Sequence, residues 1–213
     1  LYRDIYMAIH PILAILPQGE VLLANPDSDP EGAIKVSYIQ LHLAPLTEEQ
    51  AANLKDRLLH VLGQVKVTSR DWKPMLSLLE TALSELRQLS AGRLEADRDE
   101  AIAFLEWLRN NNFTFLGMRE YNYTGDGENA TVERDKGSGL GILSDPNVLV
   151  LRQGQSQVTT TPEILAFLQG PDFLIVTKAN VKSVVHRRAY MDYIGIKRFG
   201  PDGKVVGELR IVG

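Results

Sequence analysis

FLIVTKANVKSVVHRRAYMDYIGIKRFGPDGKVVGELRIVG, residues 173–213, decides how the C-terminal part of this chain folds. The stretch begins as an apolar run, continues through a basic bend at residues 178–188, and ends as two strand-like runs separated by Gly200-Pro201-Asp202-Gly203. This order predicts a buried strand followed by a β-hairpin.

The residues between the two runs are typical of a tight turn. Pro201 presets the backbone at the first turn position, Asp202 can hydrogen-bond to its own backbone, and Gly203 accepts the left-handed conformation. The turn is compatible with a loop of three or of four residues, and the two lengths give different strand registers.

Apolar residues alternate with small or polar ones along both arms of this hairpin. Alternation of this kind predicts one packed face and one face in water. The residues expected to face inward are Ile194, Ile196, Val205, Leu209 and Ile211.

Two blocks of the chain, FLEWLRNNNFTFLGMREY at residues 104–121 and VVHRRAYMDYIGIKRFGPDGKVVGELRIVG at residues 184–213, carry a family pattern. The pattern resembles the N-terminal region of the very large bacterial NAD-dependent glutamate dehydrogenases. The resemblance covers most of residues 93–213 and, more weakly, the first seventy or so. It implies a segment upstream of the catalytic domain, in the part of the parent enzyme taken to be regulatory. The matching residues are Phe113, Phe115, Leu116, Gly117, Arg119, Glu120 and Tyr121, then Lys178, Val185, His186, Arg187, Tyr190, Asp192, Ile194, Lys197, Arg198, Gly203, Gly207, Glu208 and Arg210.

Composition narrows the class of protein. A chain of 213 residues with 44% apolar residues fits one large or two small globular domains. It has no cysteine, which suits a cytoplasmic protein, and its net charge of -4 argues against a general nucleic-acid binder. We expect no membrane span, because no run approaches the roughly 20 apolar residues required.

Residues 1–73 read as strands followed by a helix. The apolar run 5–16 suits a central strand with a bulge, edge position or bend at Pro11, and 25–32 is a polar turn before a second strand at 35–43. Thr47 and Gln50 form a capping box, and the helix that follows carries an apolar stripe from Ala51 to Val65 that suits packing on a sheet. This order predicts a partial ferredoxin-like α/β sandwich of the ACT type that lacks its first strand and helix.

Residues 74–92 are expected to form a connecting helix with Pro74 in its first turn. A third segment, 93–213, follows, with a second capping box at Asp97 and Glu100 and a chain reversal at 110–112. Its remaining expected elements are strands at 113–123, 131–134 and 148–151, a turn at 125–127, a loop at 137–141 and a helix starting at 161–163. The chain as a whole is therefore predicted to be α+β, and this last part a mainly antiparallel sheet of five or six strands with flanking helices, similar to a PAS domain.

Catalytic and cofactor motifs are not recognisable. The loop GSGLG at 137–141 lacks the GxGxxG spacing, and it follows a charged run where a Rossmann strand would be apolar. The four histidines are scattered without a second ligand at metal-binding spacing. We therefore expect no catalytic, cofactor-binding or metal site within this segment; the resemblance implies NAD in the parent enzyme.

The basic bend and the arm after it are the candidate binding surface. Their cations would hold a carboxylate or phosphate effector, or an acidic surface of another domain or subunit. The plainer alternative is a solvated hairpin face whose charges pair with Glu208 and neighbouring acids. The candidate contact residues are Lys178, Lys182, His186, Arg187, Arg188, Lys197 and Arg198.

From the resemblance we expect a non-catalytic regulatory and oligomerisation segment of an NAD-dependent glutamate dehydrogenase. Its partners would be the downstream catalytic domain, further copies in a homo-oligomer, and an amino-acid or dicarboxylate effector. The parent would convert L-glutamate, NAD and water to 2-oxoglutarate, ammonium and NADH. The alternative is a stand-alone ligand-binding or scaffold module with no dehydrogenase attached, and an open reading frame that continues into a Rossmann domain would discriminate the two.

Overall fold

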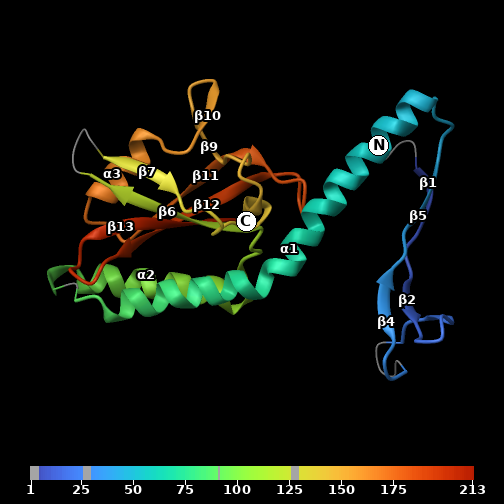
Figure 1. Cartoon of the computed structure of the whole chain (residues 1–213), viewed down its shortest axis with the longest axis horizontal. Helices are drawn as coiled ribbons and strands as arrows, with labels where there is room; N and C mark the ends of the chain where they lie inside the picture. The colour runs from blue at the N-terminus through green and yellow to red at the C-terminus, as the bar shows by residue number, and fades with distance from the viewer. Residues whose placement is uncertain (1–4, 26–29, 91, 126–129) are drawn as a thin grey trace. The chain divides into compact units, whose positions relative to one another are not determined.

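A computed structural model describes residues 5–25, 30–90, 92–125 and 130–213. The chain forms two compact units, Leu1–Arg57 and Leu58–Gly213, which are treated separately (Figure 1). Both contain helix and strand, and every strand pairing in the described residues is antiparallel, so the predicted α+β class is confirmed.

The first unit contains two small sheets. The order is β3-β2-β4 in one sheet and β1-β5 in the other. The predicted strand 5–16 is two strands divided at Pro11, which lacks the amide hydrogen needed to continue a ladder. The strands are β1 (Ile5–Ile9), β2 (Ile12–Ile15), β3 (Val21–Leu23), β4 (Ile34–Ser37) and β5 (Gln40–Leu43). Part of the predicted turn 25–32 lies outside the described residues.

These strands have little core of their own. Among the described residues of this unit, Ala14 is the one buried apolar side chain, whereas Tyr6 and Leu23 are each 75% exposed. The expectation of a central strand packed on both faces is therefore wrong for this unit by itself.

Helix α1 (Glu48–Gln88) crosses from the first unit into the second. The predicted capping box at its start is confirmed: the Thr47 amide donates to Gln50 Oε1 at 2.9 Å, and the Gln50 amide donates to Thr47 Oγ1 at 3.2 Å. The two helices expected before and after Pro74 are one continuous helix, because a single proline removes one backbone bond while good helix formers surround it. The apolar stripe expected on a sheet is instead largely exposed, for example at Leu58 and Leu62.

The second unit is built on a six-stranded antiparallel sheet, as predicted. Its order is β11-β12-β13-β6-β7, with β8 paired to β6 (Figure 1). The strands are β6 (Gly117–Thr124), β7 (Thr131–Arg134), β8 (Leu140–Gly141), β11 (Leu174–Lys182), β12 (Tyr190–Phe199) and β13 (Val205–Val212). The other elements are β9 (Leu151–Gln153), β10 (Ser156–Val158), α2 (Glu95–Trp107), α3 (Pro162–Gln169) and the short helices Gly92–Leu94, Leu108–Asn112 and Ile142–Ser144.

Two hydrophobic layers enclose this sheet. On one face Ile194, Ile196, Leu209 and Ile211 pack with the C-terminal half of α1 and with α2. On the other face Tyr193, Val212 and Met191 pack with α3, β9 and the Ile142–Ser144 turn. The expectation that one hairpin face lies in water is therefore wrong, and Val205 packs on the α3 side rather than with the other four.

The predicted turn at 200–203 is confirmed and its register is resolved. The Gly200 amide donates to the Lys204 carbonyl at 2.8 Å, and the Gly203 amide donates to the Gly200 carbonyl at 2.9 Å. Gly203 has φ +76°. Three residues therefore lie inside the closing bond, and Phe199 pairs with Val205.

Strand β11 differs from the predicted buried strand. It is the edge strand of the sheet, and Val176 in its middle is 55% exposed. The predicted basic bend at 178–188 begins late, because β11 continues with an irregularity to Lys182, opposite Tyr190.

The elements before β6 combine a correct and a wrong prediction. The reversal at 110–112 is confirmed, with Asn111 at φ +62°. The second capping box is wrong: α2 starts at Glu95, its N-cap residue Leu94 makes no side-chain capping bond, and Asp97 lies inside the helix. Strand β6 starts at Gly117 rather than 113. The strand expected at 148–151 is misplaced, because β9 starts at Leu151 and ends at Gln153. Part of the turn at 125–127 lies outside the described residues.

Candidate functional site

The face of the sheet that α3 covers carries charged side chains in strand register. Arg119 of β6 lies opposite Arg210 of β13, and Glu208 of β13 lies opposite Lys197 of β12. Residues paired across antiparallel strands point to the same side, so these side chains share one surface. All four are at most 3% exposed. These four residues therefore bury three cations and one carboxylate on the same face of the sheet.

Glu208 neutralises one of these cations. Its Oε2 accepts a hydrogen bond from Arg210 Nε at 2.9 Å, and its Oε1 accepts one from the Tyr193 hydroxyl. The Arg210 guanidinium also stacks on the Tyr121 ring, with 3.7 Å between the guanidinium carbon and the ring centroid. Burial raises the pKa of Tyr193 well above its usual value, and the Glu208 carboxylate raises it further, so the hydroxyl remains a donor.

Arg119 has no such counter-charge. Its Nε donates to the Leu143 carbonyl at 3.0 Å, and its Nη2 donates to the carbonyls of Leu143 and, at 2.7 Å, Asp145. These acceptors are neutral, and Arg119 makes no ion pair with any carboxylate in the described part of the chain. A guanidinium that is 3% exposed thus carries its charge without an anion from the described residues.

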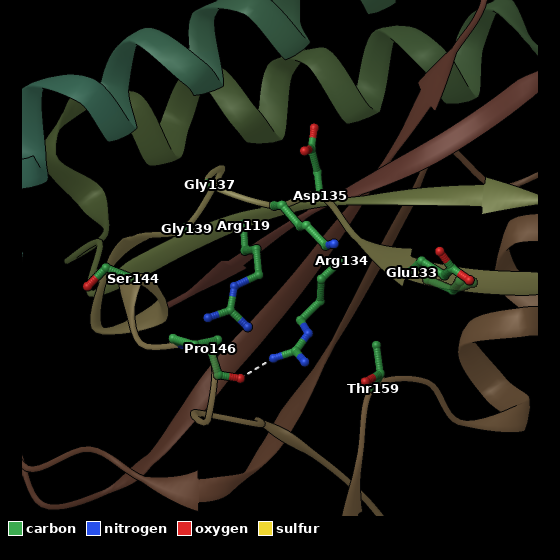
Figure 2. Close-up of a pocket in the computed structure, with 11 residues that line it drawn as sticks. Arg119, Glu133, Arg134, Asp135, Gly137, Gly139, Ser144, Pro146 and Thr159 are labelled. Carbon is green, nitrogen blue, oxygen red and sulfur yellow. Dashed lines mark hydrogen bonds between the residues drawn. The ribbon is translucent and has the colours of Figure 1, made fainter.

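A cavity of about 680 Å³ opens beside this guanidinium. In Figure 2 the side chains of Arg119 and Arg134 extend toward the same wall, where Arg134 Nη1 donates to the Pro146 carbonyl. Thr159 lies on the opposite wall. The cavity is lined by Arg119, Val132, Glu133, Arg134, Asp135, Lys136, Gly137, Gly139, Ser144, Pro146 and Thr159.

The loop that contributes Gly137 and Gly139 to the cavity lining is fixed at Gly141, where any other residue would be strained. Gly141 has φ +59° and ψ -136°, and an added Cβ would lie 2.2 Å from the Leu116 carbonyl oxygen. Its amide donates to the buried carboxylate of Asp71 on α1 at 2.9 Å. A hydrogen bond from Arg70 lowers the pKa of Asp71 below its usual value, and the Gly141 amide adds to this shift. The GSGLG loop at 137–141 is therefore held by packing and by α1.

Two donors at the back of this site lack partners among the described residues. They are Arg210 Nη2 and Thr160 Oγ1, both buried. Arg210 Nη1 donates to the carbonyl of Thr159, which lines the cavity. The unused donor capacity thus lies next to the cavity wall.

The basic residues singled out from the sequence fall in separate places. Lys178, His186 and Arg187 line a second cavity of about 390 Å³, where Lys178 pairs with Asp192 at 2.5 Å. Lys182 Nζ lies 5.0 Å from the Tyr190 ring centroid, and Arg188 is exposed.

Lys197 and Arg198, the last two candidate contact residues, lie on opposite faces of the sheet. Lys197 Nζ donates to the Gly170 carbonyl at 2.5 Å, and burial lowers its pKa to about 8. Arg198 pairs with Glu85 of α1 and with Glu120. The seven residues do not converge on one site.

Arg134 and Thr159, which line the first cavity, were missed by the sequence reasoning, and Arg119 appeared there only as part of the family pattern. Arg119 stands in a strand where alternation places it on a covered face, which was the available signal. In the part of the chain that the structure describes, no group of three histidine or acidic side chains could hold a metal ion. Within the same residues no helix is both long and apolar enough to cross a membrane.

The fold and the site define an α+β domain whose antiparallel sheet buries charged side chains in one face. No family model matches the sequence. Over 162 residues, 75% of this chain, it is 33% identical to the NAD-specific glutamate dehydrogenase of Pseudomonas aeruginosa. Over 161 residues, 73% of the chain, it is 32% identical to the enzyme of the same name from Halomonas elongata.

The chain spans about 10% of the length of each of these relatives. The predicted resemblance is confirmed, and the chain is related to one segment of the NAD-specific glutamate dehydrogenases.

Proposed function

We propose that this chain is a non-catalytic regulatory segment, near the N-terminus, of an NAD-dependent glutamate dehydrogenase, and that it binds a small carboxylate effector in the cavity at Arg119. The parent would oxidise L-glutamate with NAD and water to 2-oxoglutarate, ammonium and NADH. NAD and the catalytic residues would belong to other parts of that enzyme. The similarity to a tenth of two such dehydrogenases supports this over a stand-alone scaffold module.

The buried guanidinium of Arg119, which has no anionic partner in the described part of the chain, carries the proposal. Burying a cation is costly unless an anion and hydrogen bonds compensate it, and carbonyl dipoles supply only the hydrogen bonds. A carboxylate in the cavity would supply the missing charge. Nε and Nη2 of Arg119 already donate to carbonyls, so Nη1, which contacts the Tyr121 hydroxyl at 3.5 Å, is the nitrogen left to donate to the ligand. Arg198 shows the alternative within the same sheet, because two glutamates already neutralise it.

Ligand titration tests the effector role. Calorimetry and thermal unfolding of the chain with amino acids and dicarboxylates should reveal binding; a ligand at 100 times its dissociation constant would stabilise the domain by about 2.7 kcal/mol. Arg134→Met should weaken binding without unfolding the domain, because Arg134 lines the cavity and is exposed. The matched control is Arg152→Met, an exposed arginine outside the cavity lining. If no candidate binds, the effector role is wrong.

The non-catalytic part of the proposal has its own assay. The purified chain with L-glutamate and NAD should form no NADH above background. Turnover that is lost on substituting residues of this chain would place catalysis here and contradict the proposal.

Contacts with other polypeptide form a second part of the proposed role. The segment would act beside the catalytic part of the same chain, in a cytoplasmic homo-oligomer. The exposed apolar side chains of the first unit, such as Tyr6, Leu23 and Ile34, support contact with further protein, because patches of this kind commonly mark interaction surfaces. Light scattering during size-exclusion chromatography of the parent enzyme would test the oligomer, and a strict monomer would count against it.

The finer fold assignments belong to the same proposal. The ACT-type assignment of residues 1–73 is supported by antiparallel strands followed by a helix, and the PAS-like assignment of residues 93–213 by one antiparallel sheet with helices beside it. An experimental structure of a longer piece of the parent would decide both.

A further inference from the structure

We infer that the cavity at Arg119 selects a small oxyanion carrying two negative charges and no ammonium group, such as a dicarboxylate or an inorganic phosphate, over a zwitterionic amino acid. This rests on the proposed function, which requires only that some carboxylate binds there. The inference follows from where the acidic side chains around the cavity point and from the charge buried behind it.

The strand ladder separates the acids from the cations. Arg134 pairs with Tyr121, and Arg119 lies two residues before Tyr121, so both arginines are on the α3-covered side of the sheet. Glu133 pairs with Asn122 and therefore projects to the opposite side. Figure 2 shows the Asp135 carboxylate directed away from the two guanidiniums. An ammonium group on a ligand held by the arginines would meet no carboxylate from these two residues.

The charge behind the cavity favours a dianion over a monoanion. Arg119, Arg210 and Lys197 are buried in this face, and Glu208 is the one buried carboxylate there in the described residues. Nη2 of Arg210 has no hydrogen-bond partner among the residues that the structure describes, so donor capacity remains after Arg210 has bound Glu208. Glu208 compensates only part of the positive charge of these residues. The attraction between that charge and a second negative charge on the ligand therefore exceeds the cost of removing the second charge from water.

A matched pair of ligands tests the selectivity. Glutarate and L-glutamate share five carbons and two carboxylates and differ in one ammonium group. By calorimetry at low ionic strength, glutarate should bind about tenfold or more tightly than L-glutamate, since an unmatched charged group in a site typically forfeits a factor of this size. Butyrate, a monoanion, should bind more weakly than glutarate. Inorganic phosphate tests whether two carboxylates or only two charges are needed.

The variants locate the binding. Arg134→Met should weaken glutarate binding at least about tenfold, whereas Arg152→Met, outside the cavity lining, should leave it unchanged. Circular dichroism would check that each variant is folded, and Arg134→Lys, which keeps the charge but not the fork, should recover part of the affinity.

Each outcome decides something different. Binding of L-glutamate as tight as that of glutarate, or weakened by Glu133→Gln, would overturn this inference and leave the proposed effector role intact. If phosphate binds and glutarate does not, the preference for a doubly charged anion stands, but the carboxylate effector of the proposed function is wrong. Unchanged glutarate affinity in folded Arg134→Met would place the ligand elsewhere and overturn the inference. No binding by any of these ligands would overturn both.

Discussion

Replacing Glu208 with glutamine removes the buried carboxylate that pairs with Arg210 while keeping the shape of the side chain. Glu208 is 0% exposed and accepts from Arg210 Nε and from the Tyr193 hydroxyl. Breaking a buried pair by neutralising one partner costs about 3–5 kcal/mol, because the other charge stays buried. That is a large part of the 5–15 kcal/mol that stabilises a typical domain. Arg119 is the cross-strand neighbour of Arg210 and Tyr121 contacts both, so Arg210 would be left without a carboxylate next to a second cation.

Urea unfolding followed by tryptophan fluorescence would measure this loss, since Trp72 and Trp107 both lie in the second unit. With a slope of about 2 kcal/mol per molar urea, Glu208→Gln should lower the midpoint by about 2 M at unchanged slope. Glu106→Gln is the matched control: Glu106 pairs with Arg87 at 2.5 Å, but both side chains are 40% exposed, and its midpoint should not move. Equal midpoints for the two variants would refute the claim that the charge on this face is buried and coupled.

Three further predictions follow from single contacts. In the same urea assay, Gly141→Ala should destabilise the second unit by about 3 kcal/mol or more, because the added Cβ would collide with the Leu116 carbonyl. Gly137→Ala should cost about 1 kcal/mol, because Gly137 has φ +92° but open space around it. The pKa of Asp71 is lowered in the folded chain, so its carboxylate stabilises the fold above its unfolded pKa of about 3.9, and this stability is lost as the pH falls through the folded pKa. Asp71→Asn should therefore cost about 1–3 kcal/mol of unfolding free energy near neutral pH and less in acid. A cost that does not change with pH would contradict this. Thr47→Ala should speed hydrogen exchange at the Gln50 amide by about fivefold, for a cap worth about 1 kcal/mol, and Thr47→Ser should not.

The features that the sequence predicted correctly are local ones. The Thr47 cap, the reversal at Asn111 and the turn at 200–203 each depend on backbone bonds within four residues, and the residue types that make those bonds are few. The wrong predictions depend on packing between distant parts. The residues around Pro74 are compatible with a helix start and with a continuous helix, and nothing in the alternation of 190–212 shows that α3 covers the polar side.

The candidate site was hidden for the same reason. Basic residues are densest in the sequence at 178–198, but in the structure most of these charges are solvated or paired. Arg119 is the one basic residue of strand β6 and is followed by Glu120, so the local sequence shows no cluster of positive charge there. Its importance appears only once the sheet is assembled, because burial and the absence of a carboxylate partner among the described residues are properties of the fold.

The two sequence blocks that carry the family resemblance, separated by more than sixty residues, meet on this face of the sheet. Tyr121 pairs with Glu208 and Arg119 with Arg210, so the first block supplies a ring and a cation to the second block's ion pair. Each member constrains another: Glu208 requires a buried donor, Arg210 requires Glu208, and Tyr121 occupies the space between the two arginines. Arg119 is the member of this group that pairs with no carboxylate among the described residues. Because it lines an open cavity, an anion from solution can reach it.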